Sequence, residues 1–160
     1  EMRRLLGVLR SEETHGELVP QPGLTQIGQL VEATARAGGA VEFSPCEHEV
    51  PDAVGLSAYR IVQEALANVV RHAPGATTRV SLSVPEPDGG PGGEHLTVLV
   101  VNGPPPRPPG RPLETGGTGH GLVGMRERVR LVGGTLDVGP LPDGGFRVAA
   151  RLPLAGKDFT

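Results

Sequence analysis

Glu64 and Asn68 are the residues of this chain whose types and spacing best suit chemistry. They stand four residues apart in the stretch 59–73, YRIVQEALANVVRHA, so on a helix they lie one turn apart on the same face. A carboxylate and an amide suit Mg²⁺, which takes few protein oxygens and leaves its other positions to water and phosphate. The pattern therefore predicts a metal and phosphate site on a helix. The alternative is an amphipathic helix with a solvated polar side.

The residues around this pair predict how the helix is placed. Asp52 stands before it as an expected N-cap. On the polar face, Arg60 and either Arg71 or His72 extend the spacing of Glu64 and Asn68 in both directions. Apolar residues recur at helical spacing and should form the buried face: Leu56, Tyr59, Val62, Leu66 and Val69.

A second segment, GGTGHGLVGMRERV at 116–129, runs a glycine cluster into a helix. Glycines let the backbone approach a ligand closely, and the free amides at a helix start favour an anion. The alternative is a flexible loop that leads into a helix. The buried stripe of the helix should consist of Leu122, Met125, Val129 and Val132.

Three common phosphate-binding classes do not fit. The P-loop needs a lysine in its motif, and Lys157, near the C-terminus, is the only lysine of the chain. Residues 119–124 match GxGxxG, but the dinucleotide fingerprint must follow a strand directly. Here a proline-rich insert separates it from the strand expected at 96–101. The protein-kinase signatures HRD and DFG are absent.

Three motifs together resemble the catalytic ATP-binding domain of a sensor histidine kinase. They are QEALxNxxRHA at 63–73, GxGxGLxGMRER at 117–128 and the glycine-led strand GGFRV at 144–148. The resemblance is closest to the subgroup that controls nitrate response and membrane-lipid fluidity. That subgroup is common in actinobacteria, which we take as the expected source. The resemblance implies the Bergerat fold, an α/β two-layer sandwich whose mixed, mostly antiparallel sheet packs against three helices.

The resemblance also implies a site for ATP and Mg²⁺ between the two helices. Glu64 and Asn68 would be the catalytic residues and Asn68 the metal ligand. Glu64 corresponds to the residue that activates water in hydrolysing relatives, and here it would orient a water or the metal shell. The implied ATP-binding residues are Asn68, Arg71, His72, Asn102, Gly103, Gly117, Thr118, Gly119, His120, Gly121 and Leu122.

The chain departs from the family at Asn102-Gly103-Pro104, where relatives carry Asp-x-Gly against the adenine. Asn102 can accept the adenine amino group through its amide oxygen, but without charge. A hydrogen bond to a charged group contributes about 1.5–3 kcal/mol and a neutral one about 1. We therefore expect weaker ATP binding, or a partly degenerate domain.

None of the five histidines stands in the acceptor context of the family, a histidine followed by an acidic residue on a helix. His48 precedes Glu49, but in a short loop. The phosphoacceptor should therefore lie on a dimerisation domain outside this chain, from which phosphate passes to a response regulator. The full-length protein would be a homodimer. Two alternatives remain: an anti-sigma-type kinase or switch module of the same fold, and a degenerate nucleotide-binding interaction domain.

The expected organisation follows from these motifs. Residues 1–23 would be the end of a dimerisation helix and a linker, 24–154 the catalytic domain and 155–160 a tail. The proline-rich stretch within 103–120 would be the lid over ATP, although on its own it resembles a polyproline ligand. Strands are expected at 41–44, 78–84, 95–101, 135–138 and 146–152, the last two forming a hairpin, and a helix at 24–37.

Composition excludes other classes. A net charge of −3 argues against nucleic-acid binding. No apolar run is long enough to cross a membrane, so we expect a cytoplasmic fragment without membrane contact, from a longer protein whose membrane anchoring stays open. The single cysteine, Cys46, excludes an internal disulfide and fits a reducing compartment.

Overall fold

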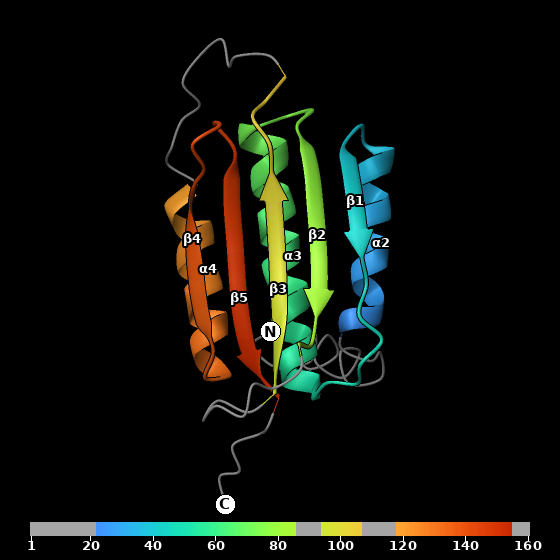
Figure 1. The fold of residues 1–160 in the computed structure, drawn as a ribbon, viewed down its shortest axis with the longest axis vertical. Coiled ribbons are helices and arrows are strands. Elements are labelled where there is room, and N and C mark those ends of the chain that lie inside the picture. The colour runs from blue at the N-terminus through green and yellow to red at the C-terminus, as the bar shows by residue number, and fades with distance from the viewer. Residues whose placement is uncertain (1–21, 86–93, 107–117, 155–160) are drawn as a thin grey trace, which may run out of the picture.

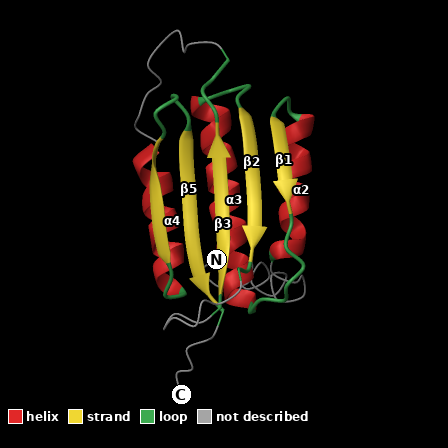
Figure 2. Ribbon diagram, viewed as in Figure 1, coloured by secondary structure: helices red, strands yellow, loops and turns green. Residues whose placement is uncertain are grey.

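In the computed structural model, three helices cover one face of a five-stranded sheet (Figures 1 and 2). The structure describes residues 22–85, 94–106 and 118–154. The elements are α2 (Leu24–Arg36), β1 (Ala40–Ser44), α3 (Asp52–His72), β2 (Thr77–Ser83), β3 (His95–Asn102), α4 (Thr118–Leu131), β4 (Thr135–Pro140) and β5 (Phe146–Pro153). None of the helices among these residues is long and apolar enough to cross a membrane.

The sheet has the order β1-β2-β3-β5-β4. β1 and β2 are parallel and are connected through α3, whereas the pairs β2–β3, β3–β5 and β5–β4 are antiparallel. This arrangement confirms the expected two-layer α/β sandwich with a mixed, mostly antiparallel sheet on three helices.

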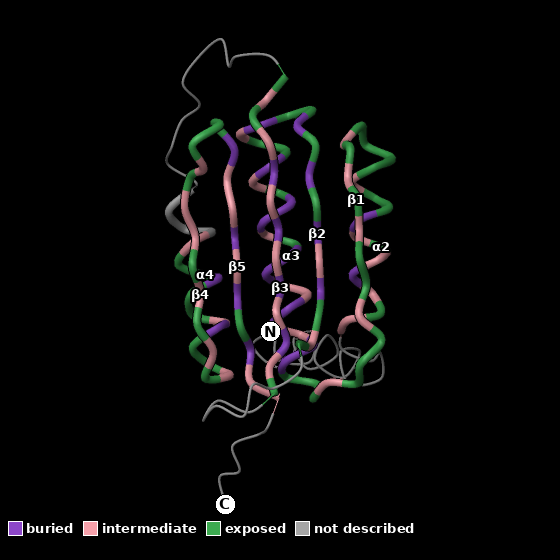
Figure 3. The backbone as a smooth tube through the Cα atoms, in the orientation of Figure 1, coloured by how far each residue is buried: buried purple, intermediate pink, exposed green. Residues whose placement is uncertain are grey.

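Alternation along the strands explains why only one face of the sheet is covered. On β3, the side chains of Leu96, Val98 and Val100 are buried, while the residues between them are half-buried (Figure 3). A strand that alternates in this way presents its buried side chains to a core and the others to solvent. The core therefore lies between the sheet and the helices.

The core stripe of α3 is broader than predicted. Val62, Leu66 and Val69 are buried as expected, but Leu56 and Tyr59 are only half-buried. The stripe is instead completed by residues that the prediction left out: Val54, Ala58, Ile61 and Ala65. The physical reason is that α3 packs against the sheet and also against α2 and α4, so more of its circumference is covered.

The predicted N-cap of α3 is wrong. Pro51 occupies the cap position, and Asp52 is the first helical residue without a capping hydrogen bond. Its carboxylate still lies in the first turn, where negative charge is favourable to the helix dipole.

The β4–β5 hairpin is confirmed, with both strands slightly longer than predicted. Leu141 N donates to Gly145 O at 2.8 Å, and Gly144 has a φ of +95°, which favours glycine. At Gly145 there is no room for a side chain, because a Cβ would overlap the carbonyl oxygen of Asn102. The hairpin turn is thus packed directly on the end of β3.

Candidate functional site

The polar side of α3 faces α4. Ser57 Oγ donates to the carbonyl oxygen of Arg128 at 3.4 Å, which fixes this side of α3 against α4. Glu64, Asn68 and Arg71 follow Ser57 at intervals of seven, four and three residues, so they lie on the same side of the helix. The predicted pair Glu64 and Asn68 is therefore brought to the α3–α4 side of the domain.

The start of α4 lies at the level of Asn68. The two helices run in opposite directions (Figure 1). Asn68 is eleven residues beyond Ser57, and Thr118 is ten residues before Arg128, which is roughly 15 Å along each helix. The first-turn amides of α4, which lack helical partners, thus lie at about the level of Asn68.

The glycine-led segment enters α4 earlier than its sequence suggested. Thr118, Gly119, His120 and Gly121 already belong to the helix, and the structure describes no more than their backbone. Further along α4, Met125 and Val129 are buried as predicted, and Leu122 packs against the core. Val132 also packs against the core but lies just beyond the last helical residue, Leu131. Gly117 lies outside the described residues, as do Arg107 and Arg111 of the expected lid.

The side chain of Asn68 has an unmet hydrogen-bonding requirement. Its Oδ1 is buried and has no hydrogen-bond partner in the structure. Leaving a buried acceptor without a partner costs about 1–3 kcal/mol. An oxygen in this state fits Mg²⁺, which would need little more from the protein because phosphate and water complete its shell. Among the described residues, no cluster of three or more acidic, histidine or cysteine side chains offers a different metal site.

Glu64 is held by Arg71. Arg71 Nη2 lies 3.4 Å from Glu64 Oε2, and both side chains are partly exposed. Arg60, which was also placed on this face, donates from Nη1 to Gln63 Oε1 at 3.0 Å instead. Of the two candidates Arg71 and His72, the structure thus gives Arg71 to the carboxylate, while His72 is half-buried at the end of α3.

Asn102 ends β3 as a buried polar residue on the helix side of the sheet, with 6% of its surface exposed. Its Nδ2 donates to Gly103 O at 2.8 Å, so the amide oxygen is the acceptor that remains for a ligand. Gly103 N donates in turn to Thr77 O at 2.9 Å. Opposite Asn102 in the β2–β3 register lies Thr78, which is also buried. Thr78 was not among the predicted site residues, because its position opposite Asn102 arises from the pairing of β2 with β3.

Local packing bears on Pro104, which stands where relatives carry the glycine of Asp-x-Gly. A Cβ on Gly75 would come within 3.0 Å of Pro106 Cγ, and one on Gly144 within 3.4 Å of Pro104 Cβ. The chain leaving Asn102 is therefore packed between the α3–β2 turn and the β4–β5 turn. Proline is compatible with this packing because its backbone nitrogen carries no hydrogen and needs no acceptor.

Proteins similar to this chain include sensor histidine kinases. The sensor histidine kinase YxjM of Bacillus subtilis is 29% identical over 136 residues, which is 82% of this chain and 30% of that protein. The chain thus spans about a third of the length of the curated relatives that it matches.

Two solved structures share the fold. The histidine kinase domain of the blue-light activated kinase EL346 from Erythrobacter litoralis superimposes with a TM-score of 0.56 at 22% identity, over 81% of this chain and 58% of that one. Full-length ShkA in complex with AMPPNP gives a TM-score of 0.55 at 20% identity, over 84% of this chain and 30% of that one.

Residues 53–156, which include α3, Asn102 and α4, match the family described as histidine kinase-, DNA gyrase B- and HSP90-like ATPases. A match over that much of the chain is decisive. The chain belongs to this ATPase family, in the branch whose relatives are sensor histidine kinases.

Proposed function

We propose that this domain binds ATP with Mg²⁺ and donates the γ-phosphoryl group to a histidine on the dimerisation domain of the same sensor kinase. The observation that carries the proposal is the buried, unpartnered Oδ1 of Asn68 at the level of the first turn of α4. Asn68 offers a ligand for the metal, and the first turn of α4 offers backbone amides for the phosphates. The AMPPNP complex of the structural relative ShkA supports a nucleotide as the ligand.

Each predicted site residue has a role in this proposal. Asn68 would hold Mg²⁺, which supplies neutralisation of the charge on the phosphates. Arg71 would contact phosphate oxygens, and Glu64 would orient a water. The amide oxygen of Asn102 would accept the amino group of adenine. Backbone amides would cradle the phosphates in the segment that holds Gly117, Thr118, Gly119, His120, Gly121 and Leu122, and His72 and Gly103 would flank the nucleotide.

In the transfer step, an imidazole nitrogen of the acceptor histidine forms a bond to the γ-phosphorus. The bond from that phosphorus to the β,γ-bridging oxygen breaks, and ADP leaves with the electron pair. The protein contributes mainly by position and charge, as in other phosphoryl transfers. The phosphoryl group would then pass to a response regulator.

The wider setting belongs to the same proposal. We place the chain in the nitrate- and lipid-fluidity-sensor subgroup of an actinobacterium. Residues 24–154 would be the catalytic domain, residues 103–120 its lid, and residues 1–23 the end of a dimerisation helix and a linker. The domain would work in the cytoplasm, within a protein that can be anchored elsewhere along its length.

Calorimetric titration of ATP with Mg²⁺, and with EDTA in its place, tests the proposal. Binding should require Mg²⁺ and should be lost in Asn68→Ala and in Asn68→Asp. Gln63→Ala is the control, because Gln63 is exposed on the same helix and should leave ATP affinity unchanged. Unchanged nucleotide affinity in a folded Asn68→Ala protein would sink the assignment.

A further inference from the structure

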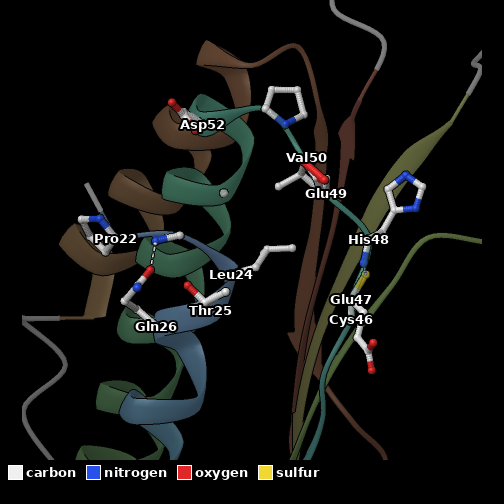
Figure 4. A pocket seen from close by; sticks show the side chains of 13 residues that line it. Pro22, Leu24, Thr25, Gln26, Cys46, Glu47, His48, Glu49, Val50 and Asp52 are labelled. Carbon is white, nitrogen blue, oxygen red and sulfur yellow. Dashed lines mark hydrogen bonds between the residues drawn. The ribbon is translucent and has the colours of Figure 1, made fainter. Parts of the chain in front are cut away.

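A cavity lies at the opposite end of α3 from Asn68. It has a volume of about 690 Å³ and opens between the start of α2 and the β1–α3 connection (Figure 4). Asp52 on its wall is sixteen residues before Asn68, roughly 24 Å along α3. The cavity is therefore separate from the proposed nucleotide site.

The lining of this cavity is acidic and partly apolar. Glu47, Glu49 and Asp52 contribute carboxylates, and no lysine or arginine is found among its described lining residues. Leu24 and Val50 provide apolar surface. An occupant should therefore combine positive charge with apolar side chains.

The start of α2 and the first turn of α3 pack closely together at one wall of the cavity. A Cβ on Gly55 would come within 3.4 Å of Gly23 Cα and 3.6 Å of Leu24 N. The backbone of α3 therefore approaches the backbone at the start of α2 closely at this point. Gly23 N also donates to Gln26 Oε1 at 2.7 Å, which fixes the first turn of α2. Two packed helices thus define one side of the cavity.

We propose that, when residues 2–10 (MRRLLGVLR) are not paired with a second chain, this cavity binds them within the same chain. That segment carries three arginines and the apolar residues Leu5, Leu6, Val8 and Leu9, which is the chemistry that the cavity selects. The neighbouring segment 11–21 has three glutamates and no lysine or arginine, so the same acidic lining disfavours it.

The connection permits this docking. The chain reaches the cavity wall at Pro22, and the eleven residues 11–21 lie between it and Arg10. Eleven extended residues span up to about 36–40 Å. Because the segment is tethered, its effective concentration is in the millimolar range, so individually weak contacts suffice. The contact would hold the domain by the end remote from Asn68 and leave the nucleotide site open. It does not depend on the proposed kinase activity.

Cys46 makes the proposal testable in the intact chain. It lines the cavity, is half-buried and is the single cysteine of the sequence. If residues 2–10 cover the cavity, the double variant Arg3→Glu/Arg4→Glu should react with iodoacetamide several-fold faster at Cys46. The control Arg126→Glu/Arg130→Glu makes the same change of charge at exposed positions of α4 and should not alter the rate. Equal rates in all three proteins overturn the proposal.

A disulfide test separates the segment of the same chain from that of a second copy. Leu6→Cys, oxidised with diamide, should give an intramolecular disulfide to Cys46 whose yield does not depend on protein concentration. Val123→Cys, on exposed α4, is the control and should give no intramolecular product. No disulfide from Leu6→Cys, or a disulfide only between chains, overturns the proposal.

Discussion

Arg71 Nη2 lies 3.4 Å from Glu64 Oε2 on the side of α3 that also carries Asn68. The ion pair spans two turns of the helix, and Asn68, whose amide oxygen has no partner, stands between its two members in the sequence. In the proposed ATP complex, phosphate would compete with Glu64 for Arg71.

Arg71→Ala should lower ATP affinity by about tenfold, the equivalent of about 1.4 kcal/mol, because a cation near the phosphates is lost. The free energy of unfolding should change by less than about 1 kcal/mol, since the pair is partly exposed. Calorimetry and urea unfolding measure the two effects.

Arg79→Ala is the matched control for Arg71. Arg79 pairs with Glu42 at 3.5 Å on exposed strand positions, so its removal should leave ATP affinity unchanged. Equal losses of affinity in both variants would show that net charge matters, and not position.

Asn68→Ala should affect stability and ligand binding in different ways. Its Oδ1 is buried without a hydrogen-bond partner, so removing it should leave the free energy of unfolding without ligand unchanged or raise it by up to about 1–3 kcal/mol. Stabilisation by Mg²⁺ and ATP should disappear at the same time. Urea unfolding with and without the ligands tests both parts. A loss of more than about 2 kcal/mol without ligand would mean that Asn68 has a structural role instead.

Asn102→Leu should abolish ATP binding, because it removes the acceptor proposed for adenine. Asn102→Asp should bind ATP as well as the wild type or more tightly. The aspartate cannot donate to Gly103 O, however, so this variant should lose about 1–3 kcal/mol of stability without nucleotide. Calorimetry and thermal unfolding of both variants provide the measurement. Strong binding by the leucine variant would place the adenine contact elsewhere.

Gly145→Ala should weaken both folding and ATP binding. Its Cβ would overlap Asn102 O, which forces the hairpin turn away from the end of β3. We expect a loss of about 1–3 kcal/mol, the usual cost of overpacking. Gly139→Ala is the control, because a Cβ there meets no atom within 4 Å. Chemical unfolding of both variants decides the matter, and equal stabilities would contradict the packing argument.

The isolated 160-residue chain should bind ATP but fail to label itself with phosphate. Given the upstream dimerising helices as a separate protein, it should label their histidine. It should also be monomeric, since no long heptad repeat is present in its sequence. Labelled ATP followed by acid and base treatment identifies phosphohistidine by its acid lability. Acid-labile label on the isolated chain would point to His48 or His15 as an acceptor within it.

Residue patterns predicted the helices and strands well, because buried residues recur with a different period in each kind of element. The alternation of Val80 and Leu82 identified β2, and the glycines at 144–145 identified the hairpin. Periodicity could not give the width of the buried stripe on α3, since that width depends on which helices flank it. This is why Ile61 was missed and Tyr59 was overrated.

The sequence could place candidate residues on one face of a helix but could not give their contacts. Spacing placed Glu64 and Asn68 on one face, and the structure confirms that placement. Spacing alone could not choose Arg71 over His72 as the partner of Glu64, because both lie within one turn of the same face. Nor could it reveal Thr78, whose position beside Asn102 arises from pairing between strands.

The central position of β3 has a consequence for hydrogen exchange. This strand pairs with β5 along its whole length and with β2 over most of it, and its inward side chains are fully covered. Amides held in this way open only in the largest unfolding events, so those of β3 should exchange with solvent among the slowest in the domain. Asn102 is the last residue of that strand. The group proposed to read the base is therefore anchored in one of the most persistent parts of the fold, and local opening elsewhere would leave its position unchanged.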